Sequence, residues 1–242
     1  MKRYIIAGLI VFLAVLVTTF PARVAYKQFA PPDLSLTGIS GSIWKGSAAE
    51  GLAGGAYLRN LTWKIKPASI LTGQLAYQVS AQPAAGQIDT NVAVGLDGAL
   101  TLSALTGSVP LDLVHEAFQQ AGIGGDLSLD FARLEMRNGL PADVEGSVTV
   151  TNFFVPNLSS AQLGDYRADF YTDNGTVMGD VADTSGVLEV NGVVTLAPDR
   201  SYSLIGNVGA RPEAPPSVTR QLEFLGSPDE KGMRPFRFEG SL

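Results

Sequence analysis

The sequence predicts a mainly β protein, in which one N-terminal transmembrane helix precedes a long curved antiparallel β-meander, a rolled sheet with two short plugging helices. Three observations predict this class. The chain of 242 residues contains 27 glycines and only 17% charged residues, a composition typical of short strands joined by tight turns. About thirteen short segments alternate apolar and polar residues, which is the period of a half-buried strand. The start of the chain differs, because residues 4–20 carry no charge.

The uncharged stretch follows the basic start Met1, Lys2 and Arg3. A helix rises about 1.5 Å per residue, so residues 4–25 are just long enough to cross a hydrocarbon core of ~30 Å. A cleaved secretory signal is the alternative, since it also has a basic start and an apolar core. Against cleavage, Pro21 and Arg23 stand where a signal needs small residues. We therefore expect residues 1–3 in the cytoplasm, a single-pass anchor at residues 4–25, and residues 26–242 on the other side of the membrane.

The β-meander is expected from strands and turns that follow one another at short intervals. Proline and aspartate at residues 31–33 end the preceding helix. Four dipeptides have the composition of two-residue hairpin turns, namely Asp97-Gly98, Asn138-Gly139, Asn174-Gly175 and Asn191-Gly192. A glycine-rich turn is expected at residues 51–55, and a turn with an apolar plug at residues 67–73. The expected strands cover residues 34–40, 43–48, 57–66, 74–81, 87–96, 99–105, 126–137, 143–151, 166–172, 177–182, 187–196, 201–208 and 236–242.

Two segments have helical rather than alternating spacing. Residues 110–121 place Leu111, Val114 and Phe118 on one face, with Pro110 in the first turn. Residues 216–225 repeat this design, and Gly226 follows as a stop. We expect both helices to cover apolar faces and edges at the open ends of the sheet. A weak subdivision of the domain is expected near residues 121–125.

Composition excludes several classes of function. There is no cysteine, so thiolate chemistry and disulfides are absent, and the net charge of −6 without basic runs argues against nucleic acid. The single histidine, His115, is read as a half-buried helix residue, because nothing in the sequence supplies the partners of a catalytic base. Asp173-Asn174-Gly175 lacks the further ligands of a calcium loop and is read as a turn. We predict no catalytic residues, no cofactor, no metal and no enzymatic activity.

The remaining cluster lies close to the anchor and consists of Trp44, Tyr57, Trp63, Lys64, Lys66 and Tyr77. Alternation places Tyr57, Leu61, Trp63 and Ile65 largely on one face. In one interpretation, the aromatic residues fill the core and the lysines form its solvated face. In the other, the six residues form a partner surface or the lining of a groove.

Several motifs resemble the type II secretion system protein N family. The anchor is followed by Gly41-Ser-Ile-Trp44-Lys-Gly46, then Leu61-Thr-Trp63-Lys-Ile65-Lys-Pro67, then Leu71-Thr-Gly73-Gln-Leu75. The match continues through Leu163-Gly164-Asp165-Tyr166-Arg167, Gly186-Val-Leu188, Phe224-Leu225-Gly226-Ser-Pro-Asp229 and the terminal Phe236-Arg-Phe238-Glu-Gly240-Ser-Leu242. The resemblance covers nearly the whole chain in this order, and is weakest over residues 83–160.

The resemblance implies a non-enzymatic component of the general secretory pathway of Gram-negative bacteria. Such a protein is anchored in the inner membrane, with residues 26–242 in the periplasm, and aids export of folded proteins across the outer membrane. Its implied partners are the inner-membrane platform and the outer-membrane secretin, and strand addition to an open sheet edge is our hypothesis for how it holds a partner. The alternative is a periplasmic lipid-binding or lipid-transport protein with an apolar β-groove, similar to AsmA-like proteins. A scaffold without a groove is a third interpretation.

Overall fold

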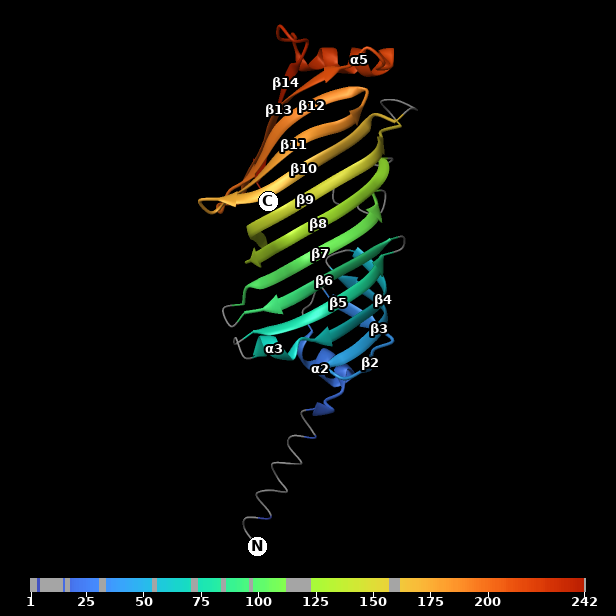
Figure 1. Cartoon of the computed structure of the whole chain (residues 1–242), viewed down its shortest axis with the longest axis vertical. Coiled ribbons are helices and arrows are strands. Elements are labelled where there is room, and N and C mark those ends of the chain that lie inside the picture. Colours follow the sequence, from blue (N-terminus) through green and yellow to red (C-terminus); the bar gives the residue numbers. More distant parts are fainter. Residues whose placement is uncertain are drawn as a thin grey trace.

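The computed structural model describes residues 4, 15, 18–30, 34–53, 56–70, 74–83, 86–95, 98–111, 123–156 and 162–241. Within these residues the chain forms one antiparallel sheet of 14 strands, which confirms the predicted meander. Figure 1 shows the strands stacked in sequence order along the long axis of the molecule. The strands are β1 (Leu34–Thr37), β2 (Ser40–Gly41), β3 (Lys45–Ala53), β4 (Ala56–Ile65), β5 (Leu75–Pro83), β6 (Gln87–Val94), β7 (Leu100–Pro110), β8 (Gly124–Arg137), β9 (Leu140–Phe154), β10 (Gly164–Asp173), β11 (Thr176–Gly186), β12 (Leu188–Leu196), β13 (Ser201–Ala210) and β14 (Arg234–Ser241).

From β3 to β14 the strand order follows the sequence, so each of these strands pairs with its neighbours along the chain. The path runs from β1 through β3 to β14, and β2 pairs with β3 beside β1. A subdivision is expected near residues 121–125, and β7 and β8, on either side of these residues in the sequence, pair from Leu100↔Met136 to Pro110↔Asp126.

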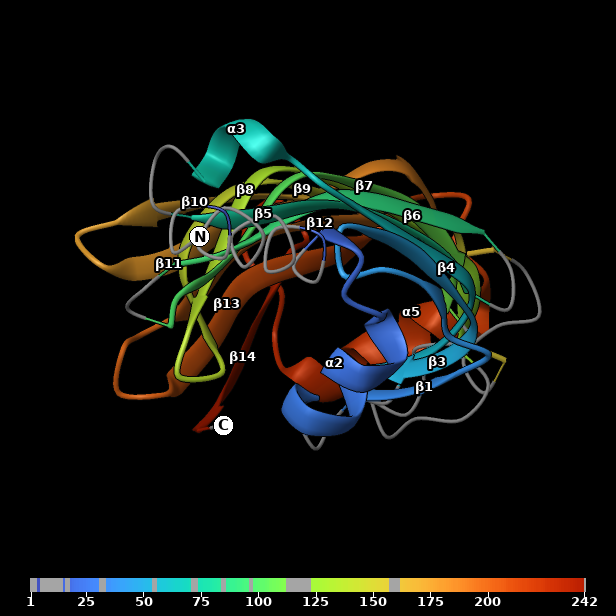
Figure 2. The same cartoon turned by 90° about the horizontal axis from the view of Figure 1, so that it is seen from below.

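The described helices are short. They are α2 (Ala22–Phe29), α3 (Pro67–Ile70), α5 (Pro216–Leu222) and the 3₁₀ turn η2 (Glu223–Leu225). Figure 2 shows the sheet curved around α2 and α5, which both lie on its concave side at opposite ends, whereas α3 lies outside the curve. Of the helices within the described ranges, none combines the length and apolar character that a membrane crossing requires. Much of the predicted anchor, residues 4–25, lies outside those ranges.

The two predicted plug helices have different outcomes. The helix expected at residues 216–225 is confirmed as α5 and η2, and its Val218 is fully buried. Most of the helix expected at residues 110–121, including His115, lies outside the described residues. Its expected start is wrong, because Pro110 is the last residue of β7 and pairs with Asp126. The turn expected at residues 67–73 begins as the single helical turn α3.

Two of the predicted hairpin turns are confirmed by their backbone conformation. Asn138 and Gly139 have φ of 52° and 78°, and Asn174 and Gly175 have φ of 49° and 80°. Positive φ at both central residues is the geometry that matches the twist of a two-residue hairpin. Asp97 of the third dipeptide lies outside the described residues.

The turn predicted at Asn191-Gly192 is wrong, because both residues lie inside β12. Gly192 pairs with Gly206 of β13. A Cβ on Gly206 would lie 2.7 Å from the Gly192 Cα and 2.7 Å from the Phe236 ring. Gly206 is therefore required by the close approach of an aromatic ring, and Gly192 by the close approach of the paired backbone, not by a turn.

The turn predicted at residues 51–55 begins too early, for a similar reason. β3 extends through Gly51 as far as Ala53. A Cβ on Gly51 would lie 2.7 Å from a methyl carbon of Leu36 on β1. Gly51 thus lies within a strand and leaves room for a neighbouring leucine.

Candidate functional site

The residues that follow the apolar stretch are bound tightly to the first strands, and we call this region the neck (residues 20–46 together with Trp63). The Ile43 N–H donates to the Phe20 carbonyl over 3.1 Å, and Pro21 forms a bridge with Ser42. The Trp63 indole N–H donates to the Ser42 carbonyl over 3.1 Å. The Trp63 hydrogen bond thus stabilises the turn at Ser42 and Ile43, which is in turn hydrogen-bonded to the end of the apolar stretch at Phe20.

Glycines make this arrangement possible. Gly46 pairs with Trp63 across β3 and β4, and a Cβ on Gly46 would lie 2.4 Å from the indole ring. Gly41 has φ of +86°, and a Cβ there would lie 2.5 Å from the Lys45 carbonyl oxygen. The glycine at position 46 of the sequence motif therefore leaves room for the Trp63 ring against the backbone of the adjacent strand.

Trp63 and Tyr77, two of the six predicted site residues, come together on the concave face. They line an open pocket of about 270 Å³ beside α2, with Ala22, Ala25 and Ile43 among its other walls. Burial raises the pKa of the Tyr77 hydroxyl above its ordinary value, in agreement with its position in this pocket. The pocket is apolar, and it is open because α2 presents alanines to it.

Tyr57 does not share this face. On β4, Arg59 pairs with Gln82 of β5 and Thr62 pairs with Ser80, so the register of the two strands shifts by one residue between these pairs. Because Gln82 and Ser80 are two positions apart, Arg59 and Thr62 lie on the same face of the sheet although they are three positions apart. This bulge reverses the alternation of side chains, so Tyr57 lies on the convex face and Trp63 on the concave face. Tyr57 is 46% exposed, and its hydrogen bond with Glu50 raises its pKa. The expectation of one shared face is therefore wrong for Tyr57.

The two predicted lysines also lie on the convex face. Lys64 lines a hollow of about 550 Å³, and Lys66 lines a separate hollow of about 370 Å³. Trp44 is half-buried. Its backbone N–H donates to the Ser42 hydroxyl, and its backbone carbonyl accepts from the Ile65 N–H. The structure thus places Trp63 and Tyr77 on one face and Tyr57, Lys64 and Lys66 on the other, so the six residues are not assembled into one site.

The concave face carries continuous rows of apolar residues that cross the strands. One row, which we call the phenylalanine row, is defined by paired residues on neighbouring strands from β7 to β14. Glycines alternate with rings along part of it, and Phe131 and Phe170 have ring centroids 6.1 Å apart. The row consists of Leu105, Phe131, Gly146, Phe170, Gly179, Val194, Leu204 and Phe238.

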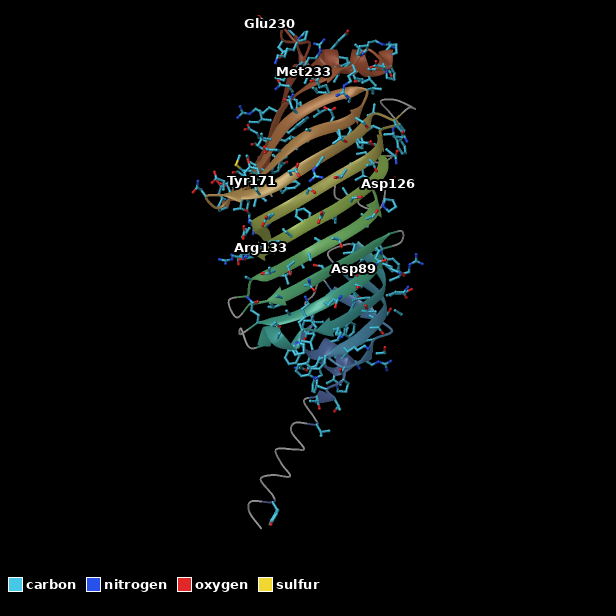
Figure 3. The ribbon with its side chains drawn as sticks, viewed as in Figure 1. Asp89, Asp126, Arg133, Tyr171, Glu230 and Met233 are labelled. Carbon is cyan, nitrogen blue, oxygen red and sulfur yellow. The ribbon has the colours of Figure 1, made fainter. Side chains whose placement is uncertain are left out.

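The convex face is polar by contrast, because strand residues alternate between faces. On β10, Arg167 and Asp169 form an ion pair of 2.7 Å. On β8, Glu135 is held by Arg133 at 2.8 Å and Arg137 at 2.7 Å. Figure 3 shows polar side chains also along the rims, with Asp89 and Asp126 on one side of the sheet and Arg133 and Tyr171 on the other.

The far end of the concave face is closed by α5. Val218 of α5 packs in a cluster with Leu163, Leu188 and Val208. Beside this cluster, the Asp183 carboxylate is 8% exposed and forms an ion pair of 2.5 Å with Arg211. Burial, with the Asp183 charge as a smaller cause, raises the pKa of Tyr166 to about 12. This end combines large apolar side chains with a paired charge.

β14 is the last strand of the sheet, and its outer edge has no strand partner among the described residues. Phe236 and Phe238 face the concave side and have ring centroids 6.1 Å apart, whereas Arg237 and Glu239 form an ion pair on the other face. Phe238 is 59% exposed. The sequence predicts a strand here, but its side chains are not among the predicted site residues, although the alternation of phenylalanine and charge is a signal that could have found them.

A metal site has no support in the described part of the chain, where no group of three or more histidine, cysteine, aspartate or glutamate residues could hold an ion. Asp173-Asn174-Gly175 forms the β10–β11 turn.

Comparison with known proteins shows the family. The family described as "Type II secretion system (T2SS), protein N" matches residues 32–237. The chain is similar to the type II secretion system protein N of Vibrio cholerae, with 29% identity over all of both chains, and to that of Aeromonas hydrophila, with 25% identity over all of this chain and 99% of the other. No solved structure matches. The chain therefore belongs to the type II secretion system protein N family and is a component of that secretion machinery, not an enzyme.

Proposed function

We propose that this chain is anchored in the inner membrane by residues 4–25 and holds another secretion component in the periplasm at the open edge of β14. Residues 26–242 then form the periplasmic domain, which aids export of folded proteins across the outer membrane. The length of the uncharged stretch supports the anchor. The observation that carries the proposed contact is β14, the open edge strand on which exposed Phe238 ends the phenylalanine row.

The chemistry of β14 indicates what kind of segment fits. An added strand gains main-chain hydrogen bonds along the edge, and its alternate side chains extend the two faces of the sheet. Phe236 and Phe238 favour apolar residues on one face of that strand, and the Arg237–Glu239 pair favours polar residues on the other. We therefore propose an extended segment with alternating apolar and charged residues as the partner.

Proline substitutions test this contact. Successive N–H groups of a strand point alternately to its two sides, so Arg237→Pro and Phe238→Pro affect different edges of β14. The variant that loses the N–H directed to the open edge loses only a donor there and should keep its melting temperature. The variant that loses the N–H directed to β13 loses a hydrogen bond within the sheet and should have a lower melting temperature. Arg237→Ala and Phe238→Ala control for the lost side chains.

The variant that keeps its melting temperature should lose co-purification of the other secretion components and should trap exoproteins in the periplasm of a complemented deletion strain. Co-purification and secretion at the level of the alanine control would contradict the proposed contact.

A second candidate function is lipid binding on the concave face, and the phenylalanine row is the observation that favours it. The row offers a continuous apolar surface along the sheet, and Leu75, Val94 and Tyr202 on the same side are each at least 40% exposed. Lipid extraction from the purified chain, followed by mass spectrometry, distinguishes the candidates. Stoichiometric acyl lipid that is lost in Phe170→Asp would favour a lipid carrier, and its absence would favour the edge contact alone.

A further inference from the structure

Two lysines face each other on the convex side of the neck without a counter-charge. Lys45 of β3 is the direct cross-strand partner of Lys64 of β4. Like charges directly opposite each other destabilise a pair of strands. Within the described ranges, neither ammonium group lies within ion-pair distance of a carboxylate, although the chain as a whole is acidic. The pair therefore has an unfavourable interaction that a bound anion would relieve.

The surroundings of the two lysines are suited to an anion. Both line the hollow of about 550 Å³, and its other polar walls are neutral hydroxyl and amide groups, from Ser40, Ser47, Thr62, Gln78 and Ser80. The Ser80 hydroxyl donates to Asp89, which also accepts from Gln87 and is not part of the lining. Hydroxyl, amide and ammonium donors without a carboxylate are the groups that bind phosphate oxygens.

The position of the hollow indicates the source of the phosphate. The Lys45 carbonyl accepts from the Ser42 N–H over 2.9 Å, and the next residue, Ile43, donates to Phe20. Phe20 is the last residue of the uncharged stretch. If the uncharged stretch of residues 4–20 crosses the membrane, as the proposed anchoring implies, Lys45 lies only a turn away from the point where the chain leaves the hydrocarbon core.

The distribution of charged residues along the chain also favours contact between the neck and an anionic membrane. Within the proposed periplasmic domain, residues 26–83 contain five Lys and Arg against two Asp and Glu, whereas residues 84–242 contain nine against 21. A negative membrane surface thus attracts the neck and repels the rest of the sheet, and the attraction amounts to about 1 kcal/mol for each basic residue near the surface.

We propose that Lys45 and Lys64 bind the phosphate of an anionic phospholipid headgroup in the membrane that holds the anchor. This contact rests on the proposed anchoring and adds a second attachment to it. A single membrane-spanning helix leaves the domain free to tilt relative to the bilayer, whereas a headgroup bound on the convex face fixes which side of the sheet faces the bilayer at the neck.

The test measures thermal unfolding of the full chain in a neutral detergent, followed by tryptophan fluorescence. Trp44 and Trp63 are the two tryptophans of the chain, and Trp63 lines the hollow. Phosphatidylglycerol added to the micelles should raise the Tm by about 5 °C, as expected for a ligand well above its Kd. The same amount of phosphatidylcholine should leave it unchanged.

The variant Lys45→Gln/Lys64→Gln should lose this rise. Without lipid, its Tm should equal or exceed that of the original chain, because the repulsion between the lysines is gone. Lys231→Gln, a matched substitution in the exposed segment before β14, should keep the full rise. An equal rise in the double variant would overturn the proposal. A rise of the same size with millimolar inorganic phosphate would overturn the assignment to a lipid.

The outcome is separable from that of the proposed function. If the apolar segment is cleaved in cells, a shortened chain in the soluble fraction reveals it and contradicts the anchoring. The measurement in micelles reads the headgroup site alone, and the secretion assay with the β14 variants reads the partner contact.

Discussion

The two ends of the concave face are closed by short helices of similar length but in different ways. At the neck, α2 buries Ala22 against Ile39 and Ala48, and an open apolar pocket remains beside it. At the far end, α5 buries Val218 among Leu163, Leu188 and Val208. Large side chains bury more apolar area and so contribute more to stability. The comparison indicates that the far end supplies stability, whereas the neck keeps open surfaces that a ligand or membrane can occupy.

Charge differs between the two ends in the same sense. The far end pairs its buried carboxylate, since Asp183 is held by Arg211. The neck leaves Lys45 opposite Lys64. An unneutralised pair at one end and a neutralised pair at the other is what we expect if only the neck binds an anion.

The largest effect is expected from Leu163→Ala at the far end. Leu163 is 1% exposed, and truncating a fully buried leucine costs about 3 kcal/mol through lost burial and the cavity left behind. Chemical denaturation should show this loss. Phe224→Ala, at an 85% exposed position in η2, is the control and should change stability little. Equal losses in the two variants would contradict the stabilising role of the cluster under α5.

A smaller effect is expected from Tyr26→Phe at the neck. The Tyr26 hydroxyl donates to the Leu34 carbonyl over 3.1 Å and accepts from the Leu36 N–H over 2.9 Å, which ties α2 to β1. Losing both bonds should cost about 1–2 kcal/mol, since the half-buried backbone groups of β1 lose their hydrogen bonds. Tyr171→Phe, on exposed β10, should change the free energy of unfolding by less than about 0.5 kcal/mol. A loss at Tyr26 as large as that at Leu163 would erase the difference between the ends.

The smallest effect concerns acid stability of the sheet between the two ends. Hydrogen bonds from Arg133 and then Arg137 hold the pKa of Glu135 below its ordinary value of 4.5. A lowered pKa in the folded state stabilises the protein fully above about pH 4.5, and this contribution is lost as the pH falls through the lowered pKa. Glu135→Gln should therefore reduce stability at pH 7 and make it less dependent on pH below 4.5.

The control for this prediction is Glu230→Gln, in the exposed segment before β14 that Figure 3 shows at the end of the molecule distant from the N-terminus. Urea unfolding at pH 7 and pH 3.5 measures both variants. If Glu135→Gln keeps the pH dependence of the original chain, the two arginines do not act through this carboxylate.

The meander was predictable because its signals are local. Period-two alternation places side chains on alternate faces, and the turns at Asn138-Gly139 and Asn174-Gly175 follow from the positive φ that these residues tolerate. The same dipeptide at Asn191-Gly192 misled, because it lies within β12, where Gly192 packs closely against the backbone of Gly206 on β13. A local pattern does not reveal which ring lies over a glycine.

The site was less predictable, because it depends on register. The bulge between Arg59 and Thr62 moves Tyr57 to the face opposite Trp63, and alternation within one strand does not reveal it. Lys45 was not among the predicted site residues, because its relation to Lys64 arises only from the pairing of β3 with β4. The signal available in the sequence was the excess of basic residues in the first third of the chain.

The strand order has a consequence for how the molecule forms and comes apart. Because each strand pairs with its neighbours in sequence, the chain resembles a one-dimensional array, in which stability is a sum of terms between adjacent units. During synthesis each new strand meets its partner already in place, so no strand waits for a distant segment. Under load, strands should detach one at a time from an end of the sheet. Among the described strands, β1 and β14 are at the two ends of the path, and Tyr26 hydrogen-bonds β1 to α2, so β14 should be the first to leave.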